Sequence, residues 1–230
     1  MHSSDPTIGP TPDDLEHAAT LAEAKGLRVR LLLITNPNNP LGTIYPPELV
    51  KSAIDWARSR KMHTIVDEIY ALSVHDTGFE SDLRTLNNDL RNDVHHVWAL
   101  SKDFGASGFR IGTLYTQNQA LLSAVANLNI FSGVSHPMQM IVSEILTDDH
   151  FIYSFLENSR ERIRDSYMLC TARLDEMVIP YIPAVRITLF FRSHVFVGLT
   201  LTNSYLLESW YLCLCRLFFP LTRANSRGRG

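Results

Sequence analysis

Three short apolar runs, each ending abruptly in polar residues, are the feature of this 230-residue sequence that most constrains its fold. They are Leu31–Ile34, followed by Thr-Asn-Pro-Asn-Asn-Pro-Leu-Gly, then His63–Val66, followed by Asp-Glu-Ile-Tyr, and Val97–Leu100, followed by Ser101 and Lys102. Each run has the length of a buried strand, and a helical pattern separates the first two. Strand, helix and strand within this length predict a right-handed parallel crossover. We therefore expect an α/β fold with a mostly parallel sheet and flanking helices.

The helices are predicted from capping signals and from apolar spacing. Thr11 is a helix N-cap followed by a proline, and Gly26 supplies a left-handed stop after a helix that runs to about Lys25. A second helix begins at Pro46-Pro47-Glu48 and has an apolar side. That side consists of Val50, Ala53, Ile54 and Ala57. Further strands are expected at 94–100 and 111–115, and further helices at 83–90, 119–128, 138–146 and, as one long helix, 149–177.

The polar residues after the runs carry the functional signal, because ligands of open α/β sheets bind beyond the carboxyl ends of the strands. Lys102 and Arg110 lie eight positions apart around a loop punctuated by Gly105 and Gly108. This pair suits a ligand with a carbonyl and a phosphate, since lysine forms imines and the arginine fork binds phosphate. Taken alone, a lysine here is more often simply solvated.

Three motifs together resemble one family. They are Asn-Pro-Asn-Asn-Pro-Leu-Gly, Asp-Glu-Ile-Tyr and Ser-Lys-Asp-Phe-Gly-Ala-Ser-Gly-Phe-Arg-Ile-Gly, and they place Asn39, Asp67, Lys102 and Arg110 at separations of 28, 35 and 8 positions. In this order and spacing they resemble the class I/II, fold-type I aminotransferases that depend on pyridoxal 5'-phosphate, and most of all the 1-aminocyclopropane-1-carboxylate synthase-like branch. The resemblance covers roughly residues 11 to 183.

The resemblance implies a role for each matching residue. Lys102 would form the imine with the cofactor aldehyde and later move the proton of the substrate's α-carbon. Burial beside a cation such as Arg110 would lower the pKa of such a lysine from near 10.4 towards the working range of a base. Asp67 would hold the ring nitrogen, although an aspartate at this point can also simply cap the strand end. Asn39 and Tyr70 would bind the phenolic oxygen of the ring, and Arg110 the phosphate.

The sequence departs from the family pattern in several places. Many members have a phosphate-binding serine three residues before the lysine, where this chain has Ala99. Since one hydrogen bond to a charged oxygen contributes about 1.5–3 kcal/mol, the change should weaken cofactor retention without abolishing it. Ser101 is a partial substitute. The family's glycine-containing phosphate loop, its ring-stacking aromatic residues and its substrate-binding arginine have no counterpart here.

Composition and context exclude several other functions. A net charge of −3 gives no electrostatic footprint for nucleic acid or an anionic membrane, and three cysteines make no disulfide framework. Asp67-Glu68 lacks a P-loop, and Asp103-Phe104-Gly105 lacks the other kinase motifs. His95 and His96 are adjacent on a strand and point to opposite faces, so no shared metal is expected. Cys213-Leu-Cys215 stands alone, and no metal site is predicted.

Three regions are expected along the chain. Residues 1–148 would be a partial cofactor-binding large domain, and residues 149–184 a long connecting helix and the start of a small domain. Residues 185–230 form a divergent apolar tail with a disordered end, too often interrupted by charges for a confident membrane span. The abrupt change near Ala184 suggests an altered reading frame, a retained intron or an alternative end. The chain is thus expected to be incomplete at both ends.

Two functions follow from the resemblance. One is a cofactor-dependent enzyme acting on a small-molecule amino-acid substrate, by transamination or by an elimination on S-adenosylmethionine. The other is an inactive, truncated remnant, or a dimerisation partner of a full-length protein, since the family builds its sites across a homodimer. No signal peptide is evident, so the cytoplasm is the expected compartment.

Overall fold

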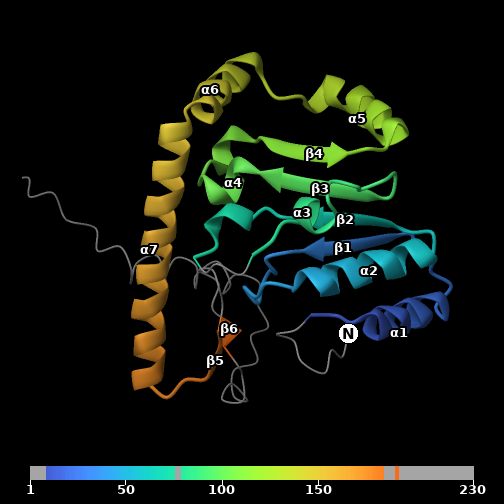
Figure 1. The fold of residues 1–230 in the computed structure, drawn as a ribbon, viewed down its shortest axis with the longest axis horizontal. Coiled ribbons are helices and arrows are strands. Elements are labelled where there is room, and N and C mark those ends of the chain that lie inside the picture. The colour runs from blue at the N-terminus through green and yellow to red at the C-terminus, as the bar shows by residue number, and fades with distance from the viewer. Residues whose placement is uncertain (1–8, 76–78, 184–189, 192–230) are drawn as a thin grey trace, which may run out of the picture. The chain divides into compact units, whose positions relative to one another are not determined.

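The computed structural model describes residues 9–75, 79–183 and 190–191. Its central element is a four-stranded sheet of β1 (Leu31–Thr35), β2 (His63–Asp67), β3 (Val94–Ala99) and β4 (Gly112–Thr116), in that order. The first three strands are parallel and β4 is antiparallel to β3 (Figure 1). The predicted mostly parallel α/β fold is confirmed. The predictions for residues 185–230 lie outside the described residues, except at β6 (Phe190–Phe191), which pairs with β5 (Tyr181–Ile182).

The reversal at β4 follows from the connection that precedes it. Residues 100–111 contain only α4 (Leu100–Asp103) and the 3-10 turn η2 (Ser107–Phe109). A parallel return needs a crossover that spans the sheet, usually a full helix, and two single turns are too short for that. Because Ala99 pairs with Gly112, this connection projects from the edge at which β1, β2 and β3 end.

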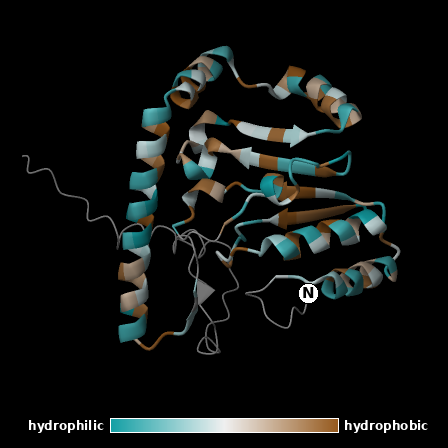
Figure 2. Cartoon of the chain, viewed as in Figure 1, coloured by the Kyte–Doolittle hydropathy of each residue, from teal (hydrophilic) through white to brown (hydrophobic). Residues whose placement is uncertain are grey.

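Helix α2 (Pro47–Ser59) buries the four residues predicted from spacing, Val50, Ala53, Ile54 and Ala57, and it packs against β1 and β2. Of these, Val50, Ala53 and Ile54 belong to the main core, which also includes Ile34, Val66 and Val94. Leu31 and Leu33, which alternate with the buried positions of β1, are 47% and 61% exposed. Accordingly β1 is hydrophobic along most of its length in Figure 2, although one of its faces is open.

Helix α1 (Pro12–Glu23) begins with the predicted Thr11 cap, which forms a full capping box. The Thr11 hydroxyl accepts the Asp14 amide at 3.3 Å, and the Asp14 carboxylate accepts the Thr11 amide at 2.9 Å. The helix ends at Glu23, slightly before the predicted end, and Gly26 has the expected positive φ of 76°. The prediction of a helix over 83–90 was too long, because α3 covers only Asp82–Thr85.

Three helices follow the sheet: α5 (Gln119–Ser132), α6 (His136–Thr147) and α7 (Asp149–Glu176). The 28 residues of α7 form one continuous helix, as predicted. Arg160 of α7 donates through Nε to the carbonyl of Leu72 at 2.8 Å, so this helix lies against the turn after β2, the 3-10 turn η1 (Ala71–Ser73). Among the described helices, none is both long and apolar enough to cross a bilayer.

Candidate active site

The predicted site residues lie at or just beyond the ends of strands β1, β2 and β3, or just before β4. Asp67 is the last residue of β2, Lys102 lies in α4 directly after β3, and Arg110 lies just before β4. Asn39 follows β1 after four residues, and Tyr70 leads into η1. The parallel ladder of β1 and β2 holds up to this edge, because the Asn36 amide donates to the Asp67 carbonyl at 3.0 Å.

Lys102 and Tyr70 face each other across this edge. The Lys102 Nζ lies 5.8 Å from the centroid of the Tyr70 ring, which is the distance of a cation–π contact. Lys102 is exposed and Tyr70 is half-buried. The described residues therefore bring the amine close to a phenol ring. They do not bury it, although the sequence analysis expected a buried lysine.

Asp67 caps the end of β2, which is one of the two roles that the sequence analysis allowed for it. Its Oδ1 accepts the backbone amide of Ile69 at 3.1 Å, which closes the turn after β2. A carboxylate offers about four lone-pair sites, so this single bond leaves acceptor capacity for a second partner. The capping role and a role at a ligand's ring nitrogen are thus compatible in one side chain.

The asparagines in the turn after β1 have different roles. Asn36 Oδ1 accepts the Tyr45 amide at 2.9 Å, and Asn38 donates through Nδ2 to the Tyr45 hydroxyl at 2.6 Å. These two residues build the turn, and Asn39 is left exposed at its tip. Asn39 also lies on the wall of a cavity of about 290 Å³ that is lined mainly by apolar residues of α1, β1 and α2. None of the other predicted site residues lines this cavity.

Arg110 adopts a backbone conformation that is unusual for a residue other than glycine. Its φ of 55° and ψ of 41° lie in the left-handed region, which costs about 1–2 kcal/mol for an L-residue. The exposed guanidinium donates through Nη1 to the Ser107 carbonyl at 3.2 Å. Ser101, half-buried in α4, lies in the same connection.

Asp103, next to Lys102, is a buried residue of this region to which the sequence assigned no role. It is 3% exposed, and its carboxylate accepts from the Trp98 indole at 2.7 Å and from the Leu72 amide at 3.1 Å. The Ser73 hydroxyl donates to it as well. Burial raises the pKa of Asp103, and the hydrogen bonds from Ser73 and Trp98 oppose that rise. The kinase-like triplet in which Asp103 stands is thus a structural turn.

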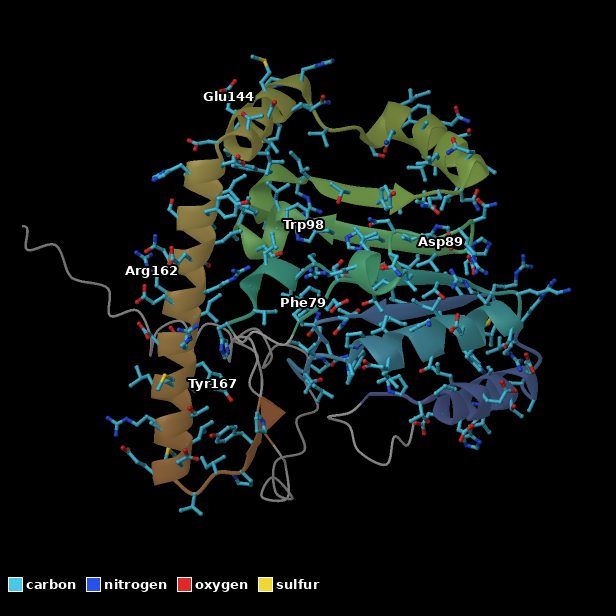
Figure 3. All side chains as sticks on the ribbon, viewed as in Figure 1. Phe79, Asp89, Trp98, Glu144, Arg162 and Tyr167 are labelled. Atoms are coloured by element: carbon cyan, nitrogen blue, oxygen red, sulfur yellow. The ribbon has the colours of Figure 1, made fainter. Side chains whose placement is uncertain are left out.

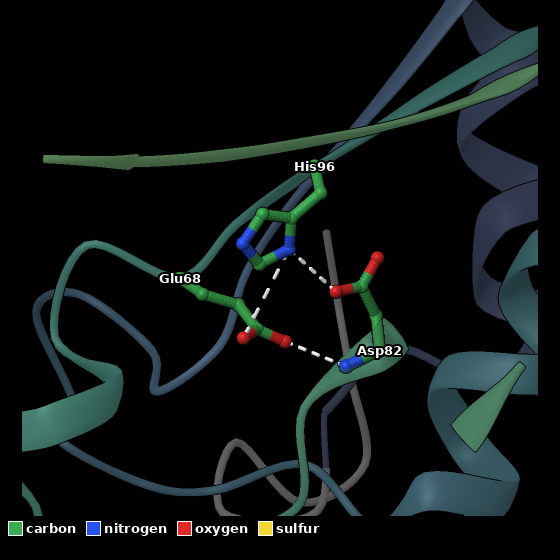
Figure 4. Close-up of side chains that lie close together, drawn as sticks. All are labelled: Glu68, Asp82 and His96. Atoms are coloured by element: carbon green, nitrogen blue, oxygen red, sulfur yellow. Dashed lines mark hydrogen bonds and ion pairs between the residues drawn. The ribbon is translucent and has the colours of Figure 1, made fainter. Parts of the chain in front are cut away.

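A second buried cluster, formed by Glu68, Asp82 and His96, lies beside Asp67. Figure 4 shows both carboxyl groups turned towards one nitrogen of His96. Its Nδ1 lies 2.6 Å from Asp82 Oδ1 and 3.9 Å from Glu68 Oε2, and Glu68 Oε1 accepts the Asp82 amide at 2.6 Å. This cluster was not predicted from the sequence. The sequence signal for it is weak, namely an acidic residue, Glu68, directly after Asp67.

The electrostatics of this cluster favour the protonated forms of Glu68 and His96. Burial, and next the charge of Asp82, raise the pKa of Glu68 to about 8. Burial alone would lower the pKa of His96, but the hydrogen bond and charge of Asp82 outweigh it, and the net shift is upward. One ligand atom from each residue lies within 4.8 Å of the others. However, two ligands of one tetrahedral zinc ion lie about 3.3 Å apart, so the 2.6 Å contact is a hydrogen bond.

The predicted divergence of His95 and His96 is visible in their contacts. His95 Nε2 lies 2.9 Å from His63 Nδ1, and its Nδ1 lies 2.7 Å from the Thr116 hydroxyl. His96 instead contacts Asp82. The two adjacent histidines therefore belong to separate polar groups on opposite faces of the sheet.

Comparison with known proteins identifies the family. The sequence matches the profile described as "Aminotransferase class I and II" over residues 1–195. The chain belongs to this family. It is 36% identical over 169 residues to 1-aminocyclopropane-1-carboxylate synthase 6 of Oryza sativa subsp. japonica, covering 72% of this chain and 31% of that protein. It is 37% identical over 174 residues to a human protein named "Probable inactive 1-aminocyclopropane-1-carboxylate synthase-like protein 2", covering 74% and 31%.

Solved structures agree on the fold. Aspartate aminotransferase from Thermus thermophilus with maleate superposes with a TM-score of 0.67 at 22% identity, covering 77% of this chain and 44% of that chain. This likeness confirms the expected resemblance to the large domain of a fold-type I aminotransferase. The chain spans about a third of the length of the first two curated relatives described above.

Proposed function

We propose that this chain binds pyridoxal 5'-phosphate at the common edge of β1, β2 and β3, as the cofactor-binding part of an aminotransferase-like protein. The observation that carries the proposal is the position of the Lys102 amine 5.8 Å from the Tyr70 ring, at the edge where Asp67 ends the neighbouring strand. Membership of the family supports the same cofactor.

The donor set fits the chemical groups of this cofactor. Lys102 would hold the aldehyde carbon, and Arg110, with Ser101, would bind the phosphate through charge-assisted hydrogen bonds. Asp67 would hold a proton on the ring nitrogen, while Asn39 and Tyr70 would donate to the phenolic oxygen. When bound, the cofactor supplies an electron sink for negative charge at the substrate's α-carbon. The Lys102 amine, once released, would take up the proton from that carbon.

The substrate class would be a small α-amino acid. Two reactions are open to this set of residues: transamination, and an elimination on S-adenosylmethionine of the kind named in the synthase relatives. Both begin with the loss of the α-proton, and for that step the residues proposed above suffice. By analogy with the family, the site would be completed across a homodimer. The residues that bind the rest of the substrate would decide between the two reactions.

A second candidate is a non-catalytic member of the family that binds the cofactor weakly or pairs with a longer partner. Two observations favour it. Lys102 and Arg110 are exposed, so the described residues do not exclude water from the amine. In addition, Ala99 stands where many members have a phosphate-binding serine. This candidate predicts cofactor attachment without turnover.

Reductive labelling tests the proposal, because the chain has only four lysines. The lysine amine and the cofactor aldehyde condense with loss of water, and hydride from borohydride fixes the bond as a secondary amine. Peptide mass spectrometry would then give the share of label on Lys102 and on the exposed Lys25, Lys51 and Lys61. We expect Lys102 to be labelled preferentially, Lys102→Ala to remove that preference, and Lys51→Ala to preserve it. Equal labelling of all four lysines would contradict the proposal.

Turnover separates the two candidate functions. Protein reconstituted with pyridoxal 5'-phosphate, without borohydride treatment, would be incubated with amino acids and, separately, with S-adenosylmethionine. Release of a keto acid would establish transamination, and release of methylthioadenosine would establish elimination. Selective attachment at Lys102 with neither product would establish the non-catalytic candidate.

A further inference from the structure

Asp103 connects η1, about 30 positions earlier in the chain, with the end of β3 and with α4. Its carboxylate accepts from the amide of Leu72 and the hydroxyl of Ser73, both in η1, and from the indole of Trp98 on β3. Its own backbone closes α4, the turn that contains Lys102. A single buried side chain therefore connects the loop after β2 to the loop after β3.

The connection fixes the turn that carries Tyr70. Leu72 stands two residues after Tyr70, and its amide donates to Asp103 while its carbonyl accepts from Arg160 Nε at 2.8 Å. Both polar backbone groups of Leu72 are thus occupied, one by Asp103 of α4 and one by Arg160 of α7. The turn after β2 has little freedom to move away from α4.

Helix α7 also packs against the turn that carries Lys102. Phe104, two residues after Lys102, stacks on Phe155 of α7 with ring centroids 5.3 Å apart, and meets the Trp98 ring edge-on at 6.2 Å. Lys102 itself projects outward and is exposed. Packing around its neighbours, rather than contacts of its own stem, therefore sets the position of its amine.

We propose that Asp103 is a positioning residue, which holds the Tyr70 turn against the Lys102 turn and thereby sets the amine over the phenol ring. The inference rests on the proposed function and deepens it. In this role, the buried Asp103 fixes the position of the exposed Lys102 amine relative to the Tyr70 ring. Neither Asp103 nor its partners need to touch the cofactor for this role.

The chemistry of the contacts favours a carboxylate. The Trp98 indole and the Leu72 amide can only donate, and both reach the same oxygen, Oδ2. An asparagine could turn its oxygen towards these two donors and its NH₂ group towards the Ser73 hydroxyl, which can also accept. It would keep the contacts but lose the charge, which makes such hydrogen bonds roughly twice as strong. Asp103→Asn therefore weakens the connection with little change in shape.

The test compares Asp103→Asn with Asp89→Asn in the full chain. Asp89 is an exposed aspartate in the loop at the other end of the sheet (Figure 3), paired only loosely with Arg91 at 3.7 Å. Two quantities would be measured: the ratio of pyridoxal phosphate label on Lys102 to that on Lys51, and the amide exchange rate of the peptide covering residues 69–75. We expect Asp103→Asn to lower the labelling ratio about tenfold, equivalent to roughly 1.4 kcal/mol, and to speed the exchange. Asp89→Asn should change neither.

Two milder variants keep the test decisive if Asp103→Asn does not fold. Trp98→Phe removes one donor and retains most of the aromatic packing, and Ser73→Ala removes another. Each should lower the labelling ratio about threefold, equivalent to roughly 0.65 kcal/mol.

The outcomes separate this inference from the proposed function. Faster exchange with an unchanged labelling ratio would show that Asp103 only stabilises the turn, and would overturn the inference while the proposed function stands. An absence of preference for Lys102 in the wild-type chain would instead refute the proposed function, and the positioning role with it. A lowered ratio in the variants alone supports both.

Discussion

The edge of the sheet has two layers that differ in almost every physical respect. The outer layer consists of the exposed residues Asn39, Lys102 and Arg110, and the inner layer of the buried residues Glu68, Asp82, His96 and Asp103. The two layers meet in the sequence at Lys102 and Asp103, which are adjacent. The outer side chains have few contacts with the described residues, whereas each inner one is hydrogen-bonded to another segment.

This difference in burial and hydrogen bonding indicates that the two layers have different roles. An exposed charge costs little free energy, so residues that must meet a ligand can be kept in the outer layer without loss of stability. A buried charge is costly unless it is paired or hydrogen-bonded, so the inner layer is stable only while its partners stay in place. Stability and ligand binding should therefore be separable by mutation, although the residues concerned are neighbours.

The largest expected effect comes from breaking the inner cluster. Asp82→Ala removes the hydrogen-bond partner of His96 and leaves a buried imidazole beside Glu68 alone. We expect the free energy of unfolding to fall by about 3–5 kcal/mol, as for other buried pairs that lose one member. Urea denaturation measures this fall. Asp89→Ala, at an exposed position, should change the same quantity by less than about 0.5 kcal/mol. Equal effects of the two variants would remove the distinction between the layers.

The inner cluster also predicts a fall in stability as the pH rises from about 5 to about 8. The pKa of Glu68 is about 8 in the folded chain, above its ordinary value of 4.5, and that of His96 is raised as well. Between the ordinary and the folded pKa, the folded chain retains protons that the unfolded chain has lost, so a rise in pH favours unfolding. The slope should reach at most about 1.4 kcal/mol per pH unit for each group.

Chemical denaturation between pH 5 and 9, roughly the window around these pKa values, measures that slope. Glu68→Gln cannot ionise and should flatten the profile between about pH 5 and 8. An unchanged profile in this variant would show that Glu68 is already ionised in the folded chain.

A smaller effect, of opposite sign, is expected in the outer layer. Arg110→Gly removes the strain of a left-handed conformation, so the free energy of unfolding should rise by about 1 kcal/mol. Arg110→Lys keeps that strain and should leave stability unchanged. Thermal or urea unfolding measures both. A loss of stability in the glycine variant would show that the guanidinium has a structural role that the described contacts do not include.

The smallest expected effect on stability is that of Lys102→Ala. The side chain is exposed, and its described partner is the ring of Tyr70. Its removal should change the free energy of unfolding by about 0.5 kcal/mol or less, while reductive labelling loses its preferred position. A loss above about 2 kcal/mol would place Lys102 among the structural residues instead.

The sequence predicted well the features that depend on neighbours along the chain. The capping box at Thr11, the buried side of α2 and the single long helix α7 all follow from local spacing or composition. The common edge that carries Asp67 and Lys102 was also predictable, because parallel strands end on the same side of a sheet.

Features that depend on the meeting of distant segments were not predictable from spacing. Asp103 contacts Leu72 and Ser73 only because η1 and α4 leave adjacent strands. His96 contacts Asp82 across 14 positions, because the first residue of α3 lies beside β3. A buried carboxylate looks like any surface aspartate until its partners are known.

The most direct test of the account is whether one molecule contacts Lys102 and Arg110 at the same time. The measurement is the extent of reductive label on Lys102, relative to Lys51, with pyridoxal 5'-phosphate and with pyridoxal, which lacks the phosphate. In the wild-type chain the phosphate should raise labelling at Lys102 at least about tenfold, since charge-assisted hydrogen bonds contribute roughly 1.5–3 kcal/mol. Arg110→Ala should bring the two aldehydes close to equality, and Arg84→Ala, at another exposed arginine, should not. The same phosphate preference in Arg110→Ala as in the wild type would contradict the account.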